Sequence, residues 1–449
     1  MFNTICSISI IYLVFCQTLI TSLTHSSRTI EMADFENALD VAVIDEIQIA
    51  LDKDRGWAWI AALCGLPASE IIVAGNPSAL PVIQRIADLC GDTLETKDFP
   101  RNGDLKMEHL VSWKSIPKSS AIVCFSRKMV LQVRDIFQDM GIPCSAVYGD
   151  LSPEVRREEA RRFREGETLC VVATDAIGMG LNLPIEYVLF WETDKFDGDC
   201  DRVLMPVEIQ QIAGRAGRGL RATGYVSAFS KRDHELIEKA MAAPVPPVVI
   251  TTLDAGPTSF HIETIANELK EYRLAILLTF FKQRMTFEDV LRPFVSKDTI
   301  ITARVLDDIS TAPSVPDRLT WVRSPLNSRD NTHKEEFQKM YHSFCKGNPC
   351  QARICKIPKS DLGLLEHIYQ SHRIYRWLAK HFPTKFPDIK HVETEISTIN
   401  VRLQDILSKK HGMPHLQRNE CRWCGRAILP DSHYTECNKC HNESLNDNY

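Results

Sequence analysis

The sequence has no excess of positive charge. Its 53 Lys and Arg residues are outnumbered by 58 Asp and Glu residues, which gives a net charge of −5. This balance excludes a global basic field that would draw the whole chain to nucleic acid, so any nucleic-acid surface must be local. The sequence also has no internal repeat and no low-complexity tract, and its 449 residues suit about three domains.

The sequence lacks the short, dense cysteine framework of small secreted proteins. Most of its 15 cysteines stand singly in apolar runs, as Cys124 does in AIVCFS and Cys170 does in LCVVATD. Such positions are typical of buried, reduced thiols, and they favour an intracellular, reducing compartment.

The first 27 residues contain no Asp, Glu, Lys or Arg. Residues 4–23 are apolar enough for a membrane span or a signal core. The basic segment of a secretory signal and the Arg-rich pattern of a mitochondrial transit peptide are both missing. Two interpretations stay open: a membrane contact made only through residues 4–23, or an alternative or mispredicted start in place of the true N-terminus.

From residue 28 onward, short apolar strands alternate with helical segments, a pattern that predicts α/β domains with parallel sheets covered on both faces. A proline-rich connection at 244–257 ends this pattern, and helical segments such as 263–285 follow. The predicted parts are an uncharged segment at 1–27, a partial first α/β domain at 28–99, a second at 100–243, a helical region at 244–410 and a small cysteine-containing tail at 411–449.

The apolar run VAVI ends in Asp45-Glu46-Ile47-Gln48. The carboxyl end of a strand in a parallel sheet is where α/β folds place their ligand chemistry. Phosphoryl transfer requires a carboxylate that holds Mg²⁺ and a group that activates the attacking water, and Asp45 and Glu46 suit these two roles. Taken alone, the pair fits two solvated carboxylates at a strand end better.

A second motif, QQIAGRAGR (210–218), places Arg215 and Arg218 three residues apart with small residues between them. This spacing puts both guanidinium groups on one side of a tight turn, and arginine is preferred where phosphate oxygens are bound bidentately. An arginine supplied from across a domain cleft stabilises charge on a transferred phosphate. The alternative is a solvated basic helix end.

A third motif, VVATDAIGMGLNLP (171–184), runs from a strand into Thr174-Asp175 and then into Gly178 and Gly180. Glycines beside a strand end let backbone amides approach a sugar-phosphate chain. Taken alone, a plain strand-to-loop turn is an equal alternative.

Together, in this order, the three motifs resemble helicase motifs II, V and VI of superfamily two. The segments 28–66, AIVCFS, AVYGDL and LEHIYQSHRIYRWLAKHFPTKFPD extend the resemblance, over about residues 28–410, to the RNA helicase of the mitochondrial RNA degradosome, a DExH-type family. It implies two RecA-like domains, the first one partial, with ATP between them and RNA across their tops. It also implies an ATP-dependent RNA helicase of RNA decay and surveillance in the mitochondrial matrix, with an exoribonuclease partner.

The resemblance also implies roles for individual residues. Motif III would be Gly75-Asn76-Pro77, where the family usually has Glu in place of Asn76. The other implied roles are Mg²⁺ binding for Asp45, water activation for Glu46, RNA-backbone contact for Ser126 and Thr174, a place near the ribose for Gly180 and Asn182, and contact with the triphosphate for Gln211, Arg215 and Arg218, with Arg218 as the expected arginine finger.

The sequence has no G-x-x-x-x-G-K-[ST] segment, the loop that cradles nucleotide phosphates and helps to ligate Mg²⁺. Strands that precede DEIQ in the family are missing too. We therefore expect an exposed sheet edge, incomplete folding of the first domain and weak binding of ATP. Two rivals to the enzyme stay open: a non-enzymatic RNA-binding or scaffolding remnant, and a membrane-tethered variant.

The tail contains two C-x-x-C pairs separated by twelve residues, in CRWCGRAILPDSHYTECNKCH. Four thiolates at this spacing suit tetrahedral Zn²⁺ and predict a small zinc ribbon, with four free thiols as the alternative. Basic and aromatic neighbours would also allow contact with RNA. The predicted ligands are Cys421, Cys424, Cys437 and Cys440.

Two further groups are ambiguous. Irregular spacing makes a second metal site the less favoured interpretation of Cys345, Cys350 and Cys355 with His342. Core packing is favoured over RNA stacking for the aromatic residues Tyr369, Tyr375, Trp377 and Phe382.

Overall fold

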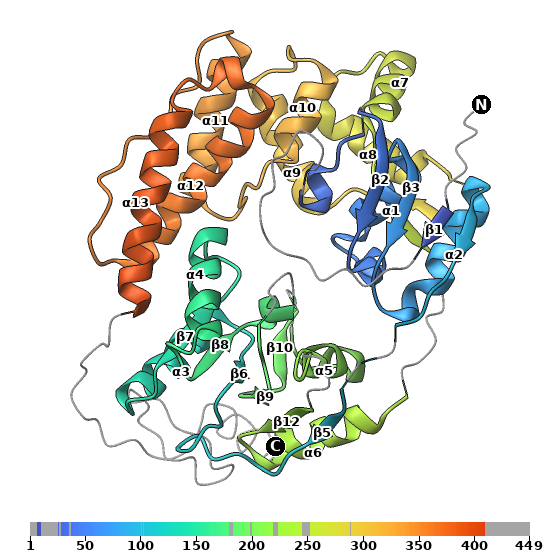
Figure 1. The fold of residues 1–449 in the computed structure, drawn as a ribbon. Coiled ribbons are helices and arrows are strands. Elements are labelled where there is room, and N and C mark those ends of the chain that lie inside the picture. Colours follow the sequence, from blue (N-terminus) through green and yellow to red (C-terminus); the bar gives the residue numbers. More distant parts are fainter. Residues whose placement is uncertain are drawn as a thin grey trace, which may run out of the picture.

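The structure is a computed structural model. It describes residues 7–9, 26, 28–35, 37–99, 101, 103–178, 183–197, 200–218, 223–244, 252–287 and 289–408. Two α/β lobes lie side by side, and a helical region lies along both of them (Figure 1). We call residues 7–99 the first lobe, residues 101–244 the second lobe and residues 252–408 the helical region.

The first lobe contains a four-stranded sheet with the strand order β2-β3-β1-β4, in which every described pairing is parallel. Its strands are β1 (Ser7–Ser9), β2 (Leu39–Ile44), β3 (Ala68–Val73) and β4 (Thr93–Glu95), its α-helices are α1 (Gly56–Gly65) and α2 (Leu80–Cys90), and its 3-10 helices are η1 (Ile30–Met32), η2 (Ile47–Leu51) and η3 (Pro77–Ala79).

Strand β2 forms one edge of this sheet. On one face of this strand Val41 and Val43 are 48% and 38% exposed, so this face is uncovered among the described residues. The opposite side of the strand, with Ala42 and Ile44, is buried against α1 and α2. Helix α2 ends at Gly91, which adopts a left-handed conformation with φ 73°.

Part of the uncharged N-terminal segment belongs to the first sheet. Strand β1 lies between β3 and β4, with Ile8 paired to Ile71 and to Leu94. The rest of the predicted membrane segment at 4–23 lies outside the described residues. Within the described residues, no helix is both long enough and apolar enough to cross a membrane.

The second lobe contains a six-stranded parallel sheet with the strand order β5-β12-β9-β6-β8-β7 and a separate antiparallel hairpin, β10-β11. Its strands are β5 (Leu105–Met107), β6 (Ser120–Val123), β7 (Cys144–Val147), β8 (Cys170–Ala173), β9 (Tyr187–Phe190), β10 (Asp194–Phe196), β11 (Asp201–Val203) and β12 (Gly224–Ala228), and its helices are α3 (Arg127–Asp139), α4 (Pro153–Arg164), η4 (Asp175–Gly178), α5 (Pro206–Ala213) and α6 (Lys231–Ala242).

Short hydroxyl side chains start three helices of this lobe. Ser126, Ser152 and Ser230 each accept a hydrogen bond from the backbone N–H three residues on, which satisfies a donor that the first helical turn leaves free. Strands β6, β7 and β8 are buried on both faces, as the continuous apolar runs predicted.

The helical region contains seven α-helices among its described residues and one two-stranded parallel sheet. Its elements are β13 (Leu253–Ala255), α7 (Ser259–Leu269), α8 (Leu274–Arg284), β14 (Leu291–Pro293), α9 (Lys297–Ile309), α10 (Val315–Val322), α11 (Asn331–Cys345), α12 (Leu362–His381), η5 (Pro383–Lys385) and α13 (Ile389–Ser408).

The helical pattern at 263–285 is interrupted in the structure. Helix α7 ends at Lys270, which adopts a left-handed conformation with φ 52°. Helix α8 then starts at Leu274, where the carboxylate of Asp307 accepts hydrogen bonds of 2.8 Å from the N–H groups of Leu274 and Ala275. The prediction of one continuous helix was therefore wrong. The start of α8 is capped by Asp307 of α9, which lies 33 residues further along the sequence, so no local pattern indicated the break.

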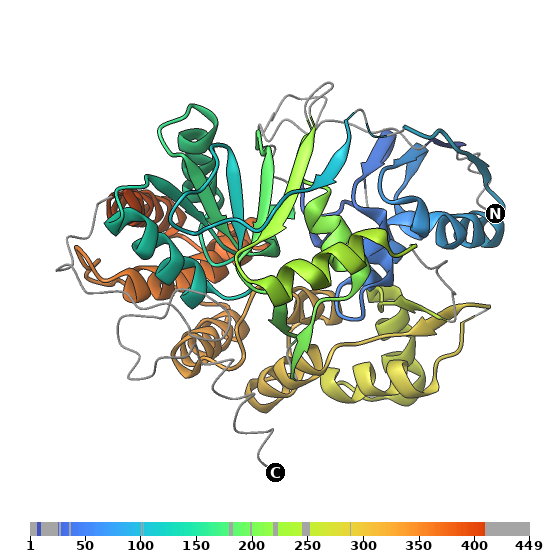
Figure 2. The ribbon, with the colours of Figure 1, turned by 90° about the horizontal axis from the view of Figure 1, so that it is seen from below.

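The helical region packs on both lobes (Figure 2). Leu253 of β13 is fully buried in the core of the first lobe. On the second lobe, Tyr148 donates a hydrogen bond of 2.6 Å to Glu366 of α12, and Arg127 forms an ion pair with the same carboxylate. One continuous apolar core joins a face of the second sheet to α12 and α13.

Candidate functional site

Asp45 and Glu46 follow directly after β2, at the carboxyl end of the strand. Glu46 adopts a left-handed conformation with φ 54° and ψ 44°, which L-residues other than glycine rarely adopt. The carboxylate of Asp45 accepts a hydrogen bond of 2.9 Å from the N–H of Glu46, and the backbone carbonyl of Asp45 accepts one of 2.9 Å from the indole of Trp59. These contacts fix the turn and aim the two carboxylates away from the core.

The side chain of Gln48 connects the acidic pair to Gly75-Asn76-Pro77. Its amide nitrogen donates to Glu46 Oε2, and its amide oxygen accepts a hydrogen bond of 3.1 Å from the N–H of Asn76. A β-carbon at Gly75 would lie 2.5 Å from the Gln48 oxygen, so glycine is required for this approach. The two sequence motifs thus form one hydrogen-bonded unit.

The arginine motif follows α5 in the second lobe. Its chain turns at Gly217, which has φ 62° and donates a backbone hydrogen bond of 2.7 Å to Ile185. Arg101, at the start of the second lobe, donates to the carbonyls of Gly214, at 3.0 Å, and Ala216. These hydrogen bonds hold the turn that carries Arg215.

Arg215 reaches across to the first lobe. Its Nη2 lies 2.9 Å from Glu46 Oε1, and its side chain is only 7% exposed, compared with 26% for Glu46. Arg218 is exposed, and its Nε donates to the carbonyl of Gly214 at 3.3 Å. The structure therefore brings the predicted arginine motif to the predicted acidic pair, and Arg215 makes an ion pair with Glu46.

Burial raises the pKa of Asp45 above its ordinary value, and the nearby charge of Glu46 adds to this effect. The backbone N–H of Glu46, Arg215 and Arg218 act in the opposite direction and lower the pKa of Asp45 without cancelling the rise. A partly desolvated carboxylate of this kind is stabilised by a cation placed beside it.

The contact between the two lobes also contains a hydrogen-bond donor without an acceptor among the described residues. Arg215 Nε is buried and has no hydrogen-bond partner among the described residues. A buried guanidinium N–H without an acceptor is costly, and an anionic oxygen would satisfy it. Asp45 and Arg215 together therefore fit a ligand that combines a metal cation with phosphate oxygens, as ATP with Mg²⁺ does.

Ser126 and Thr174 lie beyond the carboxyl ends of neighbouring strands. Val123 of β6 pairs with Ala173 of β8, so both side chains follow the same edge of the second sheet. Ser126 is exposed and also caps α3, whereas Thr174 is half-buried. Gln211, on α5, is exposed.

Several predicted residues lie outside the described part of the chain. They are Gly180 and Asn182, together with the four tail cysteines Cys421, Cys424, Cys437 and Cys440.

The weaker cysteine group is described but does not form a cluster. Among the described residues, Cys345, Cys350, Cys355 and His342 do not converge on a common point as metal ligands would. Cys350 is buried, and its thiol donates to the carbonyl of Met340. The aromatic residues Tyr369 and Tyr375 are each 2% exposed and lie in the core, as predicted.

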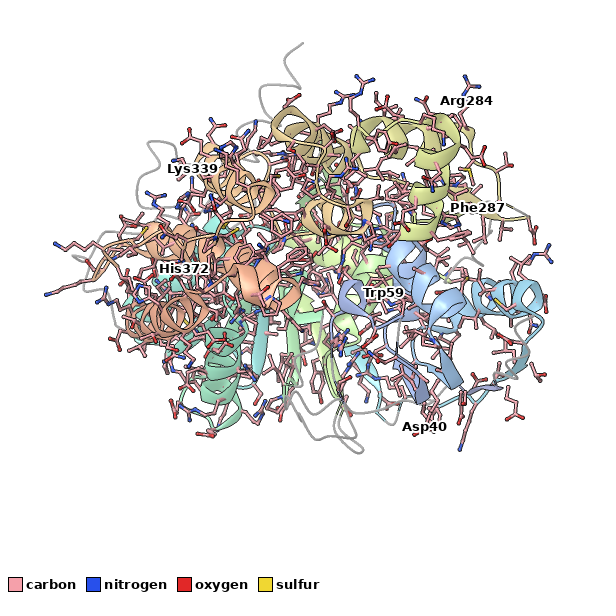
Figure 3. The ribbon with its side chains drawn as sticks, turned by 90° about the horizontal axis from the view of Figure 1, so that it is seen from above. Asp40, Trp59, Arg284, Phe287, Lys339 and His372 are labelled. Atoms are coloured by element: carbon pink, nitrogen blue, oxygen red, sulfur yellow. The ribbon has the colours of Figure 1, made fainter. Side chains whose placement is uncertain are left out.

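Sequence reasoning missed three contributors to this site: Gln48, Trp59 and Arg101. Trp59 lies on α1 in the first lobe (Figure 3). Gln48 was visible within the DEIQ motif, but no sequence signal assigned it a partner. Arg101 sits in a connection without regular structure, where sequence patterns carry little information.

Comparison with known proteins gives family matches for both lobes. Residues 16–99 match the family model described as the DEXQ-box helicase domain of Suv3, and residues 105–219 match the helicase conserved C-terminal domain. The mitochondrial DExH-box ATP-dependent RNA helicase DExH16 of Arabidopsis thaliana is 30% identical over 406 residues, which cover 87% of this chain and 70% of that protein.

Two further relatives are longer than this chain. The mitochondrial ATP-dependent RNA helicase SUV3 homolog of Caenorhabditis elegans is 31% identical over 400 residues, covering 85% of this chain and 54% of that protein. The mitochondrial SUV3 helicase of Saccharomyces cerevisiae is 30% identical over 397 residues, covering 81% and 52%. The chain thus spans about half the length of these two relatives.

Proposed function

This chain belongs to the Suv3 family of RNA helicases, and we propose that it acts as an ATP-dependent RNA helicase in mitochondrial RNA decay and surveillance. The printed names of the relatives, which describe mitochondrial ATP-dependent RNA helicases, support this assignment. The structural observation that carries it is the contact between Arg215 of one lobe and Glu46 of the other. Nucleotide hydrolysis between two lobes uses a group that activates water and an arginine that faces the phosphates, and this contact brings one candidate for each together.

ATP bound at the junction would supply the phosphoanhydride bond that is hydrolysed. Asp45 would hold Mg²⁺, which relieves the desolvation of its carboxylate. Arg215 and Arg218 would face the phosphates with Gln211 beside them, and Arg215 Nε would gain the acceptor that it lacks among the described residues. Gly180 and Asn182 would lie near the ribose.

The ion pair itself suggests how the site is regulated. While Arg215 is bonded to Glu46, one oxygen of that carboxylate is occupied by the guanidinium group and would not be free to accept a proton from water. Glu46 becomes available to orient and deprotonate water only when Arg215 has another anionic partner. Gln48 would keep Glu46 positioned during this exchange through its contact with Asn76. Contact of Arg215 with a phosphate would thereby free Glu46 to act as the base.

RNA would cross the edge of the second sheet where Ser126 and Thr174 lie. Hydroxyl groups and backbone N–H groups at strand ends are common ligands of nucleic-acid phosphates. An exoribonuclease partner would take up the unwound strand. Cys421, Cys424, Cys437 and Cys440 would bind one Zn²⁺, supported by the spacing of their two pairs.

The test is RNA-stimulated ATP hydrolysis by the purified protein in Mg²⁺. No G-x-x-x-x-G-K-[ST] segment occurs in the printed sequence, so the assay should include both this 449-residue chain and the longest protein that its transcript encodes. We expect hydrolysis that rises with single-stranded RNA and is lost in Glu46→Gln. Arg157→Ala, which alters a partly exposed arginine of α4, is the control. If neither protein hydrolyses ATP, the proposed activity is wrong.

A further inference from the structure

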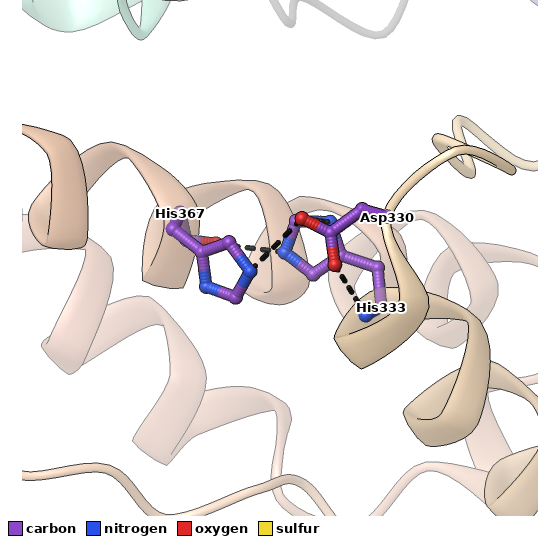
Figure 4. Close-up of side chains that lie close together, drawn as sticks. All are labelled: Asp330, His333 and His367. Carbon is purple, nitrogen blue, oxygen red and sulfur yellow. Dashed lines mark hydrogen bonds and ion pairs between the residues drawn. The ribbon is translucent and has the colours of Figure 1, made fainter.

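A cluster of three potential metal ligands lies far from the nucleotide site, where α11 meets α12. Asp330 is the N-cap of α11, His333 lies in its first turn, and His367 comes from α12 (Figure 4). One ligand atom from each residue lies within 4.8 Å of the others. Asp330 Oδ2 is 3.1 Å from His367 Nε2 and 3.7 Å from His333 Nδ1.

The hydrogen bonding of His333 determines which ring nitrogen can bind a ligand. His333 Nε2 lies 3.0 Å from the backbone carbonyl of His367. A carbonyl oxygen can only accept, so Nε2 carries the proton and Nδ1 of the neutral ring carries the lone pair. A ligating histidine in proteins commonly donates its second N–H to a backbone carbonyl in this way.

The lone pair of His333 Nδ1 is left without a partner. The residue is 3% exposed, and Nδ1 is buried with no hydrogen-bond partner among the described residues. The nearest charged group is the carboxylate of Asp330, which is itself an acceptor. Two acceptors that face each other in a buried place repel unless a cation lies between them.

Asp330 is arranged to remain an anion. Its Oδ1 accepts a hydrogen bond of 3.0 Å from the N–H of His333, which caps α11 and leaves Oδ2 facing the two imidazoles. An N–H donor of this kind favours the charged form of the carboxylate. The carboxylate is therefore charged at neutral pH.

We propose that Asp330, His333 and His367 bind a divalent transition metal ion, with Zn²⁺ as the best match. Two imidazoles and one carboxylate are ligands that zinc accepts, with bonds of roughly 2.0–2.2 Å, which places tetrahedral ligand atoms roughly 3.4 Å apart. The separations from Asp330 Oδ2, 3.1 and 3.7 Å, lie on either side of that value, and the two imidazole nitrogens lie within 4.8 Å of each other. The two rings stack with their centroids 4.2 Å apart, so ion binding would turn them until both lone pairs face the metal. Asp330 and His367 are 26% and 32% exposed, so water has access to the remaining position.

The metal would join the start of α11 to α12. His367 directly follows Glu366, whose carboxylate binds Tyr148 and Arg127 of the second lobe. A metal ion on one side of α12 would therefore restrain the helix that fixes the helical region to that lobe. Its role is structural, and it is separate from nucleotide hydrolysis.

The test measures Zn²⁺ affinity in the full chain by competition with a chelator. Because the tail cysteines would also bind zinc, all variants carry Cys421→Ser and Cys424→Ser. We expect this background protein to bind one Zn²⁺ with an increase in Tm. His367→Gln should weaken binding by about 100-fold or more, since even indirect partners of ligands are worth 10- to 100-fold. His342→Gln, on the exposed face of α11, is the matched control.

Asp330→Asn is a second variant, chosen because it should remove the ligand without disturbing the fold. Asn is as good an N-cap as Asp, so α11 should keep its helicity in circular dichroism while the anionic ligand is lost. Weaker Zn²⁺ binding in both variants, with binding kept in the His342 control, supports the site. Equal affinity in all of the proteins, or no Zn²⁺ bound by the background protein, overturns it.

Discussion

Arg215 Nη2 donates a hydrogen bond of 2.9 Å to Glu46 Oε1, and this contact joins residues that lie 169 positions apart in sequence and in different lobes. It joins a carboxylate at the end of a strand to an arginine at the end of a helix. Taken alone, each of the two residues could have been a solvated surface charge. The proposed mechanism assigns water activation to Glu46 and phosphate contact to Arg215, so mutations of these two residues test it most directly.

Removing the guanidinium tests this relationship most directly. We expect Arg215→Ala to lower RNA-stimulated ATP hydrolysis by about 10³-fold, since an arginine that stabilises phosphate charge contributes 10³–10⁵-fold in related chemistry. Steady-state hydrolysis by the protein that carries the activity is the measurement. A loss no larger than that of Arg157→Ala would assign Arg215 a purely structural role. Arg218→Ala should have a smaller effect, because Arg218 is exposed whereas Arg215 is buried.

Gln48 should act on catalysis by positioning Glu46. Gln48→Ala removes the bridge between Glu46 and the backbone of Asn76, so the carboxylate loses its fixed direction. We expect kcat to fall by about 10- to 100-fold, the effect of a small misplacement of a reacting group, with little change in KM for ATP. Gln84→Ala, on the exposed side of α2, is the control. A change confined to KM would contradict the positioning role.

Asp45 should make stability depend on pH. Because its pKa is raised in the folded chain, the folded state binds the proton more tightly than the unfolded state, whose pKa is near 3.8. The free energy of unfolding therefore falls as the pH rises from about 3.8 to the raised pKa, and the destabilisation persists at neutral pH. Asp45→Asn should remove this fall and stabilise the protein at neutral pH.

Urea unfolding at a series of pH values measures this effect, with Asp40→Asn as the control because Asp40 is exposed on the same strand (Figure 3). Mg²⁺ should reduce the advantage of Asp45→Asn, since a bound cation favours the charged carboxylate. A variant that is no more stable than the wild-type protein at neutral pH would show that Asp45 is not effectively desolvated.

Lys270 offers a test of the break between α7 and α8. An L-residue in the left-handed region costs roughly 1–2 kcal/mol, and glycine avoids this cost but loses more chain entropy on folding. We expect Lys270→Gly to stabilise the helical region by about 0.5–1 kcal/mol, measured by thermal unfolding. Lys270→Ala should give no such gain, because alanine retains the β-carbon. A stabilising alanine would show that the charge of Lys270, not its backbone conformation, matters.

Local patterns in the sequence predicted the fold where the structure is locally determined. Strand β2 ends before Asp45, α2 closes at Gly91, and Ser152 caps α4, because each depends on residues within a few positions. The break at Lys270 escaped prediction because its cap comes from Asp307. Helices α10 and α11 lie in the segment 310–360, whose polar and proline-containing sequence gave no clear periodicity.

The candidate site, too, was predictable where it depends on local sequence and not where it depends on distant contacts. The sequence predicted Asp45, Glu46 and Arg215, because their motifs carry recognisable chemistry. It did not predict which arginine meets Glu46, since this depends on how the turn at Gly217 is held by Arg101. Nor did it predict the left-handed conformation of Glu46, which only the surrounding hydrogen bonds impose.

Arg101 has a mechanical consequence. It follows the last strand of the first lobe, yet its guanidinium is attached to Gly214 and Ala216 of the second. In any relative rotation of the lobes, the chain from Arg101 onward must travel with the second lobe, which confines the pivot to the few residues after Glu95. So short a connection keeps the two lobes close together while they turn, and the helical region, which packs on both of them, adds a second restraint on their relative motion.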